Sequence, residues 1–285
     1  MPIFQRPGQP DLHYHLDDFT DPWRNAPVLI LQHGNGRSAE FWYRSVPYLS
    51  RFYKVVRPDM RGLGKSGTNF DPKTQMDPQI LIDDLADLVT HLVDTVPTDR
   101  IHFCGESLGG ILGLGLAAQH PDLLRTLTIC ATPVFISDKM KQSYALGRGS
   151  RTDAMREMGA AKWVDTTNRS TRFPPETEEG MFAWYAKTFA ANDFEVQLRL
   201  VEILNTASAE GFLPDVKLPV LGLYPDAGPI TDAEQERLLR ERLADFRIAY
   251  LPTRYHMAHM IHPATCARHV LEFIGAHDGI AVTET

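Results

Sequence analysis

The stretch that decides the fold is "IHFCGESLGGILGLGLAA", residues 101–118. A short apolar run leads to a serine between glycines, and a second apolar run rich in small residues follows. The first run predicts a strand and the second a helix. A strand-turn-helix junction of this kind holds a serine hydroxyl clear of the backbone, and its glycines let the helix pass close to the strand. We therefore interpret Ser107 as a candidate nucleophile, rather than as part of a glycine-rich turn or a phosphate-binding loop.

Strand and helix patterns alternate on both sides of this stretch. Strands are predicted at residues 28–32, 53–57, 101–104, 126–130, 219–224 and 246–251, and helices at residues 79–93, from residue 111 to near His120, and around residues 264–274. This alternation predicts an α/β fold with a doubly wound, mostly parallel sheet. Ligands in such sheets bind beyond the carboxyl ends of the strands.

The alternation stops after Thr132, and the chain from about residue 133 to residue 211 has a helical pattern. Strand signals return afterwards. We predict one α/β core built from residues 1–132 and 213–285, with residues 133–212 as a helical insertion.

Composition narrows the classes of function. The chain has 285 residues, 43% of them hydrophobic, and a net charge of −7 without a basic patch, so we expect a small-molecule substrate and no nucleic acid. The amino-terminal residues do not resemble a signal peptide and no apolar run is long enough to cross a membrane, so we expect a cytoplasmic protein without membrane contact. We expect Cys104, Cys130 and Cys266 to be buried, reduced thiols, with no metal site. The sequence leaves the oligomeric state open.

A nucleophilic serine needs a base. His256 comes just past the last predicted strand, at a carboxyl end, where its imidazole can meet Ser107 across the top of the sheet. His259 and His262 are alternatives on the following turn and helix start. We predict His256 as the base.

The tetrahedral intermediate of acyl transfer needs hydrogen-bond donors for its oxyanion. Leu108 offers one backbone N–H at the start of a helix. The second is expected from Asn35 or Gly36, in the turn that follows an early strand, and we expect His33 to order this turn.

At this point the sequence resembles the α/β-hydrolase superfamily over nearly its whole length. The motifs that carry the resemblance are "HGNGRSAEFW" (33–42), "RPDMRGLGKSG" (57–67), "GESLGG" (105–110) and "YHMAHMIHP" (255–263), in the family's order and spacing. Within the superfamily, residues 102–133 look most like 3-oxoadipate enol-lactonases and the related hydrolases of ring-cleavage products. The resemblance implies the α/β-hydrolase fold with a helical lid inserted after the sixth strand. It also implies a serine hydrolase without cofactor that acts on a small ester, a lactone or an activated C–C bond.

The resemblance further implies an acid that orients the histidine, and here the sequence departs from the family. Relatives carry this acid in a segment that follows the strand at residues 219–224, but Gly228 stands at that position and Asp226 lies two residues earlier. We predict Asp226 as the orienting acid, with Asp232 and then Asp138 as alternatives. A turn-capping role is the structural alternative for Asp226.

Other side chains have more than one interpretation. We interpret Glu106 as a structural hydrogen-bonding group near the serine, with an influence on His256 or on substrate charge as the alternative, and Asp59 and Arg61 as structural. His33, Trp163 and Trp184 are candidate pocket residues, with lid packing as the alternative for the tryptophans. Four arginines in or near the lid are candidates to hold a substrate carboxylate, although most of them are expected to face solvent: Arg151, Arg156, Arg169 and Arg172.

Three other functions stay open. A cofactor-free oxygenase or an acyl transferase is possible on the same fold, and so is a ligand receptor with slow turnover. Dehalogenation and epoxide opening are disfavoured, because in this fold they use a carboxylate nucleophile where this chain has Ser107.

Overall fold

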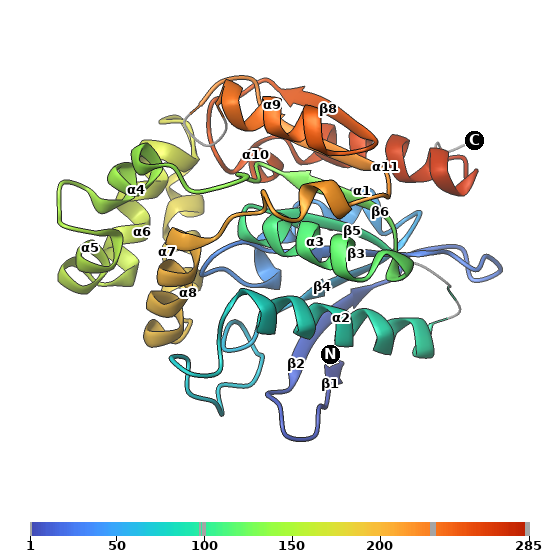
Figure 1. Cartoon of the computed structure of the whole chain (residues 1–285), viewed down its shortest axis with the longest axis horizontal. Coiled ribbons are helices and arrows are strands. Elements are labelled where there is room, and N and C mark those ends of the chain that lie inside the picture. The colour runs from blue at the N-terminus through green and yellow to red at the C-terminus, as the bar shows by residue number, and fades with distance from the viewer. Residues whose placement is uncertain (1, 97, 99–100, 229–231, 283–285) are drawn as a thin grey trace.

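The computed structural model describes residues 2–96, 98, 101–228 and 232–282. Eight strands form one sheet in the order β1-β2-β4-β3-β5-β6-β7-β8 (Figure 1). β1 and β2 pair antiparallel at one edge, and the strands from β4 to β8 are parallel. Their bounds are Ile3–Phe4, Leu12–Asp17, Val28–Gln32, Lys54–Pro58, Ile101–Glu106, Leu124–Cys130, Val220–Pro225 and Phe246–Leu251, for β1 to β8. The predicted doubly wound, mostly parallel sheet is confirmed.

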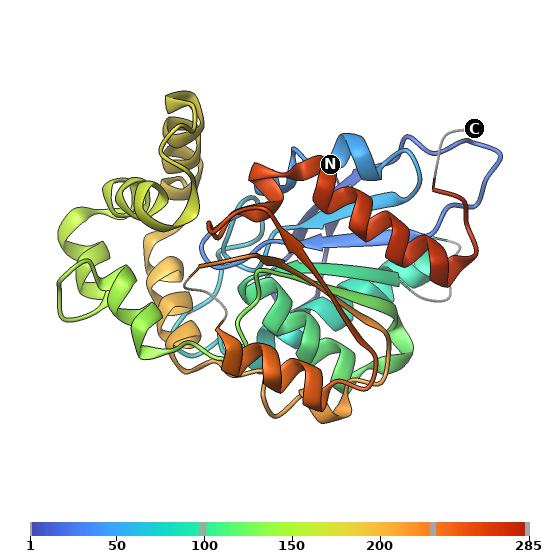
Figure 2. The ribbon, with the colours of Figure 1, turned by 90° about the horizontal axis from the view of Figure 1, so that it is seen from above.

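Helices cover both faces of this sheet (Figure 2). Alternate side chains of β3 show why: Ile30 packs toward α2 and α3, whereas Leu29 and Leu31 pack toward α1 and α11. α9 lies on the same side as α3 (Figure 2). The helices of the core are α1 (Val46–Leu49), α2 (Pro78–Thr95), α3 (Leu108–Gln119), α9 (Ala233–Arg242), α10 (Ala258–Ile261) and α11 (Pro263–Asp278). Short 3-10 turns lie at Ala39–Trp42, Pro121–Leu123 and Leu213–Asp215.

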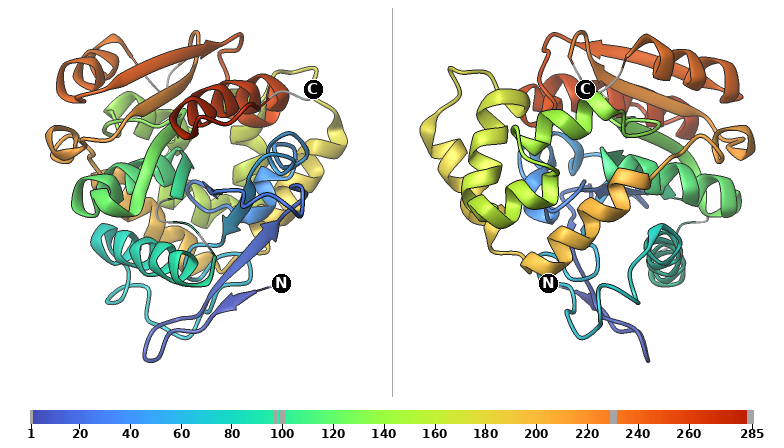
Figure 3. Two further views of the ribbon diagram at one scale, coloured as in Figure 1. Left: turned by 90° about the vertical axis from the view of Figure 1, so that its right-hand side faces the viewer. Right: turned by 60° about the vertical axis from the view of Figure 1, so that its left-hand side comes forward.

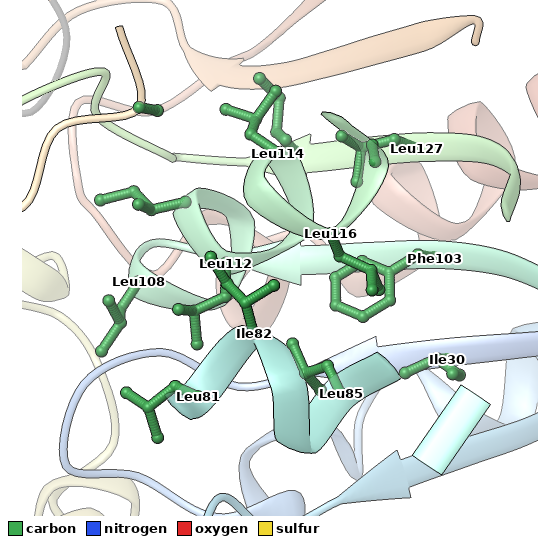
Figure 4. Packing of buried hydrophobic residues seen from close by; sticks show 14 of the residues in the cluster. Ile30, Leu81, Ile82, Leu85, Phe103, Leu108, Leu112, Leu114, Leu116 and Leu127 are labelled. Carbon is green, nitrogen blue, oxygen red and sulfur yellow. The ribbon is translucent and has the colours of Figure 1, made fainter. Parts of the chain in front are cut away.

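α3 packs very closely on the sheet because its sequence is rich in glycine. A Cβ atom at Gly113 would lie 2.7 Å from the ring of Phe103 on β5, too close for any larger residue without a shift. The surrounding leucines fill the space between α3, α2 and the sheet (Figure 4). This close packing fixes the start of α3, which directly follows Ser107.

Five α-helices separate β6 from β7. They are α4 (Asp138–Ala145), α5 (Arg151–Met158), α6 (Ala160–Thr167), α7 (Glu179–Ala190) and α8 (Phe194–Thr206), with a π-helical turn at Asn168–Arg172. We call residues 138–206 the inserted helices. They lie together at one end of the sheet (Figure 1; Figure 3, right). Phe189 of α7 packs on Gly36, in the turn that follows β3, so this end is the one where the parallel strands finish.

The inserted helices have their own hydrophobic cluster, which contains Trp163, Phe182, Tyr185 and Phe189. Met257 from the loop after β8 joins the same cluster, which fastens the insertion to the core. The helices fall within the predicted boundaries 133–212. Residues 1, 97, 99–100, 229–231 and 283–285 of the predicted core lie outside the described residues.

Elements with strong apolar patterns were predicted well, and the weaker ones were missed. The strands at residues 28–32 and 246–251 have the predicted bounds. β2 was missed because "LHYHLD" mixes histidines with apolar residues, and α9 was missed because it buries only a few apolar side chains. Cys104, Cys130 and Cys266 are buried and free. Among the described residues, no helix combines the length and apolar character that a bilayer crossing requires.

Candidate active site

Ser107 sits on a strained turn between β5 and α3. Its φ of 55° and ψ of −119° belong to a region that residues with a side chain rarely adopt. The Ser107 N–H donates to the carbonyl of Cys130 (3.0 Å), and its own carbonyl accepts from Gly110 (3.0 Å) and Ile111 (3.2 Å). These bonds hold the turn in place, and strain held in this way is typical of functional sites.

Ser107 and His256 line the same cavity, which has a volume of about 30 Å³. The cavity lies between the carboxyl ends of the strands and the inserted helices. Its apolar walls include Met140, Tyr144 and Leu204. Its polar lining consists of Asn35, Arg37, Ser107, Arg151, Arg172 and His256.

The turn after β3 borders this cavity through Asn35. Within the described part of the chain, no hydrogen bond uses the backbone N–H groups of Asn35, Gly36 or Leu108. Gly36 has a φ of +69°, and a Cβ atom there would meet the Phe189 ring at 2.7 Å, so a side chain at this position would disturb the turn. The backbone N–H groups of the three predicted oxyanion donors therefore have no hydrogen-bond partner among the described residues, and Asn35 lines the same cavity as Ser107.

His33 orders this turn instead of lining the cavity. Its Nε2 accepts from the N–H of Met60 (3.1 Å), and its Nδ1 lies 2.9 Å from the carbonyl of Gly34. An acceptor Nε2 and a donor Nδ1 describe a neutral ring. Burial lowers the pKa of His33 to about 4, which fits this state.

Glu106 is the carboxylate at the centre of the site. Its Oε2 accepts from the N–H of Gly34 (3.1 Å) and pairs with the Arg37 guanidinium. Its Oε1 lies 3.2 Å from Nε2 of His256. Burial alone would raise the pKa of Glu106, but Arg37 and His256 outweigh burial and hold this pKa well below its usual range. Glu106 is therefore an anion that joins the turn after β3, the serine turn and the histidine loop.

His256 is buried and held by the inserted segment. Its backbone N–H donates to the carbonyl of Thr171 (3.1 Å). Burial lowers the pKa of His256 despite the nearby Glu106, so the ring is neutral at pH 7. Nδ1 of His256 and Oε1 of Glu106 are both buried without a hydrogen-bond partner among the described residues, so Nε2 of His256 and Oε1 of Glu106 are in contact at 3.2 Å but not hydrogen-bonded. Ser107 and His256 share the cavity, but no hydrogen bond joins these two described residues.

The other candidate histidines lie away from this cavity's lining. The ring of His259 packs against Trp42 with centroids 4.3 Å apart, and burial lowers its pKa to about 4. His262 is half-buried between α10 and α11.

Asp226 is exposed at the end of β7 and lines a different hollow, together with Asp232. Asp232 caps α9 by accepting from the N–H of Gln235 (3.1 Å), and Asp138 is exposed at the start of α4. Residues 229–231, which complete the predicted acid segment, lie outside the described residues. Among the described residues, the carboxylate beside His256 is that of Glu106 and not one of these three. The family resemblance pointed to Asp226, but the structure leaves its side chain exposed to solvent.

The predicted pocket tryptophans pack rather than line the cavity. Trp163 is fully buried and donates its indole N–H to the carbonyl of Tyr144 (3.0 Å). Trp184 packs on Phe41, with ring centroids 5.1 Å apart. The four lid arginines divide into two groups: Arg156 and Arg169 are exposed, whereas Arg151 and Arg172 are buried in the cavity wall.

Sequence reasoning gave no role to Arg37 and left that of Glu106 between two interpretations. The signal for both was present, because Arg37 lies in the "HGNGR" turn that follows β3 and Glu106 is the last residue of β5, which is the neighbouring strand. Opposite charges buried at the same edge of a sheet are expected to pair.

Comparison with known proteins agrees with this arrangement of fold and site. The family model described as "alpha/beta hydrolase fold" matches residues 27–263. The chain belongs to the alpha/beta hydrolase fold family. This membership confirms the expected fold and the expectation of an enzyme of the hydrolase class.

Members of this family include relatives that match most of the chain. A protein of Yersinia enterocolitica named as a carbamate hydrolase, RutD, is 24% identical over 91% of each chain. The match to the protein of that name from Stutzerimonas stutzeri is 35% identical but covers only 41% of each chain. The 3-oxoadipate enol-lactonase 2 of Acinetobacter baylyi is 25% identical over 77% of this chain and 78% of its own.

Among solved structures, the enol-lactonase from Burkholderia xenovorans LB400 aligns with a TM-score of 0.79 and 25% identity, over 93% of this chain and 96% of its own. The expected resemblance to α/β-hydrolases of the enol-lactonase kind is confirmed.

Proposed function

We propose that this protein is a serine hydrolase that cleaves a small ester or lactone through an acyl-enzyme intermediate. The observation that carries the proposal is that Ser107, neutral His256 and unoccupied backbone N–H groups border one cavity at the carboxyl ends of the strands. The relatives named enol-lactonase and carbamate hydrolase support acyl chemistry on small molecules.

The reaction begins when the Ser107 hydroxyl attacks the substrate carbonyl. His256, whose neutral ring has one nitrogen with a free lone pair, accepts the hydroxyl proton and returns it to the leaving oxygen. The N–H groups of Leu108 and of Asn35 or Gly36 receive the oxyanion, with the start of α3 adding its positive dipole end. Water activated by His256 then hydrolyses the acyl-enzyme. None of these steps requires a cofactor or a metal.

The protonated form of His256 needs a nearby anion, and we assign this role to Glu106. Its Oε1 is 3.2 Å from the ring, and its low pKa keeps it charged. In the same step Arg37 holds the other carboxylate oxygen, which fixes the direction of the pair. Asp226, the acid predicted from the family resemblance, stays the alternative, and it would have to move from its exposed position to reach His256.

The inserted helices act as a lid in this proposal. A cavity of about 30 Å³ holds roughly two water molecules, which is less than an ester or lactone requires. Substrate must therefore displace lining side chains of the lid, such as Met140 and Tyr144, and the lid then excludes water from the acyl-enzyme.

The experiment that tests the proposal is hydrolysis of 4-nitrophenyl acetate and butyrate by the wild type, by Ser107→Ala and by Ser45→Ala. Ser45 is a buried serine outside the cavity and serves as the matched control. We expect Ser107→Ala to lower kcat by roughly 10⁴-fold or more, because the nucleophile is lost, and Ser45→Ala to leave it nearly unchanged.

Full activity of Ser107→Ala would contradict the proposal that Ser107 is the nucleophile. An oxygenase that works through His256 and Glu106 would keep its rate in this variant, and oxygen uptake would then identify it. Tight binding with negligible turnover by the wild type would point to a receptor instead.

A further inference from the structure

The cavity wall opposite the nucleophile contains two buried arginines, Arg151 and Arg172. Their exposed fractions are 7% and 3%. Arg151 is the first residue of α5 and Arg172 ends the π-helical turn, so both belong to the inserted helices. Each guanidinium lies over the rings of Tyr144 and Trp163, at 4.7 to 5.3 Å from the ring centroids. The shared rings bring the two positive charges close together.

No carboxylate within the described part of the chain pairs with either arginine. Arg151 makes neither a hydrogen bond nor an ion pair there, and its Nε is buried without a partner. Arg172 donates to Thr167 and, at 3.4 Å, to Asn168, which are both neutral, and its Nε also has no partner. Burying a charge without a counter-ion is costly, and two such charges side by side repel each other.

The rest of the cavity does not neutralise them. Arg37 also borders the cavity, but Glu106 already pairs with it. The lining therefore carries three arginines against one adjacent carboxylate, a surplus of two positive charges with His256 neutral. Burial and the neighbouring Arg172 lower the pKa of Arg151 to about 9, as expected for a cation that lacks an anion.

We propose that Arg151 and Arg172 bind a carboxylate carried by the substrate, so that the enzyme prefers half-esters or lactones of dicarboxylic acids over neutral esters. Planar guanidinium groups match a carboxylate through paired hydrogen bonds. Ser107 and the two arginines face one cavity from opposite parts of the fold, so the acyl carbonyl and the carboxylate lie at two ends of one molecule. This inference rests on the proposed function for the cleavage step, but not for the binding of the anion.

The test compares two substrates that differ only in charge. Mono(4-nitrophenyl) glutarate and 4-nitrophenyl pentanoate share the same ester and chain, and the carboxylate of the first replaces the methyl group of the second. We expect kcat/KM for the glutarate, corrected for spontaneous hydrolysis, to exceed that for the pentanoate by about 10- to 100-fold. Arg151→Met and Arg172→Met should each lower this ratio at least tenfold, and Arg151→Lys should restore part of it.

Arg156→Met is the matched control, because Arg156 lies on the same helix but is exposed and pairs with Glu195 at 3.7 Å. It should leave the ratio unchanged. A ratio near one in the wild type, or a ratio that both methionine variants keep, would overturn the inference. If the pentanoate is still cleaved with dependence on Ser107, the proposed function stands by itself.

A second measurement decides the matter even if neither ester is cleaved. The melting temperature of Ser107→Ala is recorded with glutarate, with inorganic phosphate and with the neutral glutaramide. We expect stabilisation by glutarate that disappears when Arg151→Met or Arg172→Met is added. Stabilisation by phosphate alone, lost in the same double variants, would identify a phosphoryl group and overturn the carboxylate assignment, and no anion effect at all would exclude the site.

Discussion

Two pairs of buried arginines occupy opposite kinds of surroundings in this molecule. In the core, Arg6 and Arg61 share the carboxylate of Asp84 on α2, each at 2.5 Å. In the inserted helices, Arg151 and Arg172 share two aromatic rings and have no carboxylate among the described residues. The exposed fractions are similarly small, so burial alone does not distinguish the pairs.

The difference separates a structural ion pair from a binding site. A guanidinium that is paired inside the chain completes the fold, and removing its partner should harm stability. A guanidinium without a partner inside the chain needs a counter-ion from outside, such as a ligand anion. Removing this guanidinium should weaken ligand binding, and it should also relieve the repulsion between the two arginines. The predictions below test this distinction, from the largest expected effect to the smallest.

Neutralising Asp84 should destabilise the fold, because Arg6 and Arg61 both pair with it. We expect Asp84→Asn to lower the free energy of unfolding by about 3–5 kcal/mol, because two buried arginines lose their shared carboxylate. Urea denaturation followed by circular dichroism measures this loss. Asp87→Asn is the control: Asp87 lies 3.3 Å from Arg6 but is largely exposed, and its loss should cost less than about 1 kcal/mol.

Arg37 is intermediate between the two pairs of arginines, because it borders the cavity but is paired with Glu106. We expect Glu106→Gln to lower kcat by roughly 10²-fold, since His256 loses the anion that stabilises its protonated form. Asp226→Asn should change kcat by less than about threefold, because the side chain is exposed and removed from the ring. The reverse order of effects in steady-state kinetics would show that Asp226 orients His256 in the reactive complex.

The comparison extends to buried histidines. Nδ1 of His13 and Nε2 of His102 each lie 2.8 Å from a carboxylate, whereas His33 and His259 are buried without one, and burial lowers their pKa values to about 4. Below pH 6.5 these two histidines bind protons in the unfolded chain but stay neutral in the folded chain. The free energy of unfolding must therefore fall as the pH falls toward 4. We expect a loss of about 2 kcal/mol for each of the two between pH 7 and pH 5.

Urea denaturation at the two pH values checks this expectation. His259→Gln should reduce the difference between pH 7 and pH 5 by about 2 kcal/mol, whatever its effect on absolute stability. Glu106 does not confuse this comparison, because its pKa lies below the usual range and its contribution is lost only at lower pH. Equal stability at pH 7 and pH 5 would contradict the prediction.

The smallest effect is also the one with the opposite sign. We expect Arg172→Met to raise the free energy of unfolding by about 1 kcal/mol in buffer free of carboxylates, because it removes the repulsion with Arg151. Thermal melting at several ionic strengths would detect the change. Destabilisation by more than about 2 kcal/mol would mean that the hydrogen bonds of Arg172 to Thr167 and Asn168 serve the fold instead.

The strand-turn-helix junction at Ser107 and the strands with continuous apolar runs were predictable, because local pattern decides them. The same is true of the position of His256 beyond the last strand and of the turn at Asn35, since chain order places both at one edge of a parallel sheet. The environment of Asp226 was not predictable, because the path of a loop decides whether its side chain faces the site or solvent. The partners of Glu106 and of the four lid arginines depend on tertiary contacts that no local pattern contains.

The division of labour between the two parts of the chain has a consequence for turnover. The nucleophile lies at the end of a sheet strand, whereas the anion-binding arginines belong to the inserted helices, and both border one small cavity. After the ester bond is cleaved, a dicarboxylate product would still contact both the core and the inserted helices. Release of the acid would then limit the rate, and dicarboxylates should act as slow-leaving inhibitors whose residence time grows as the surrounding salt is diluted.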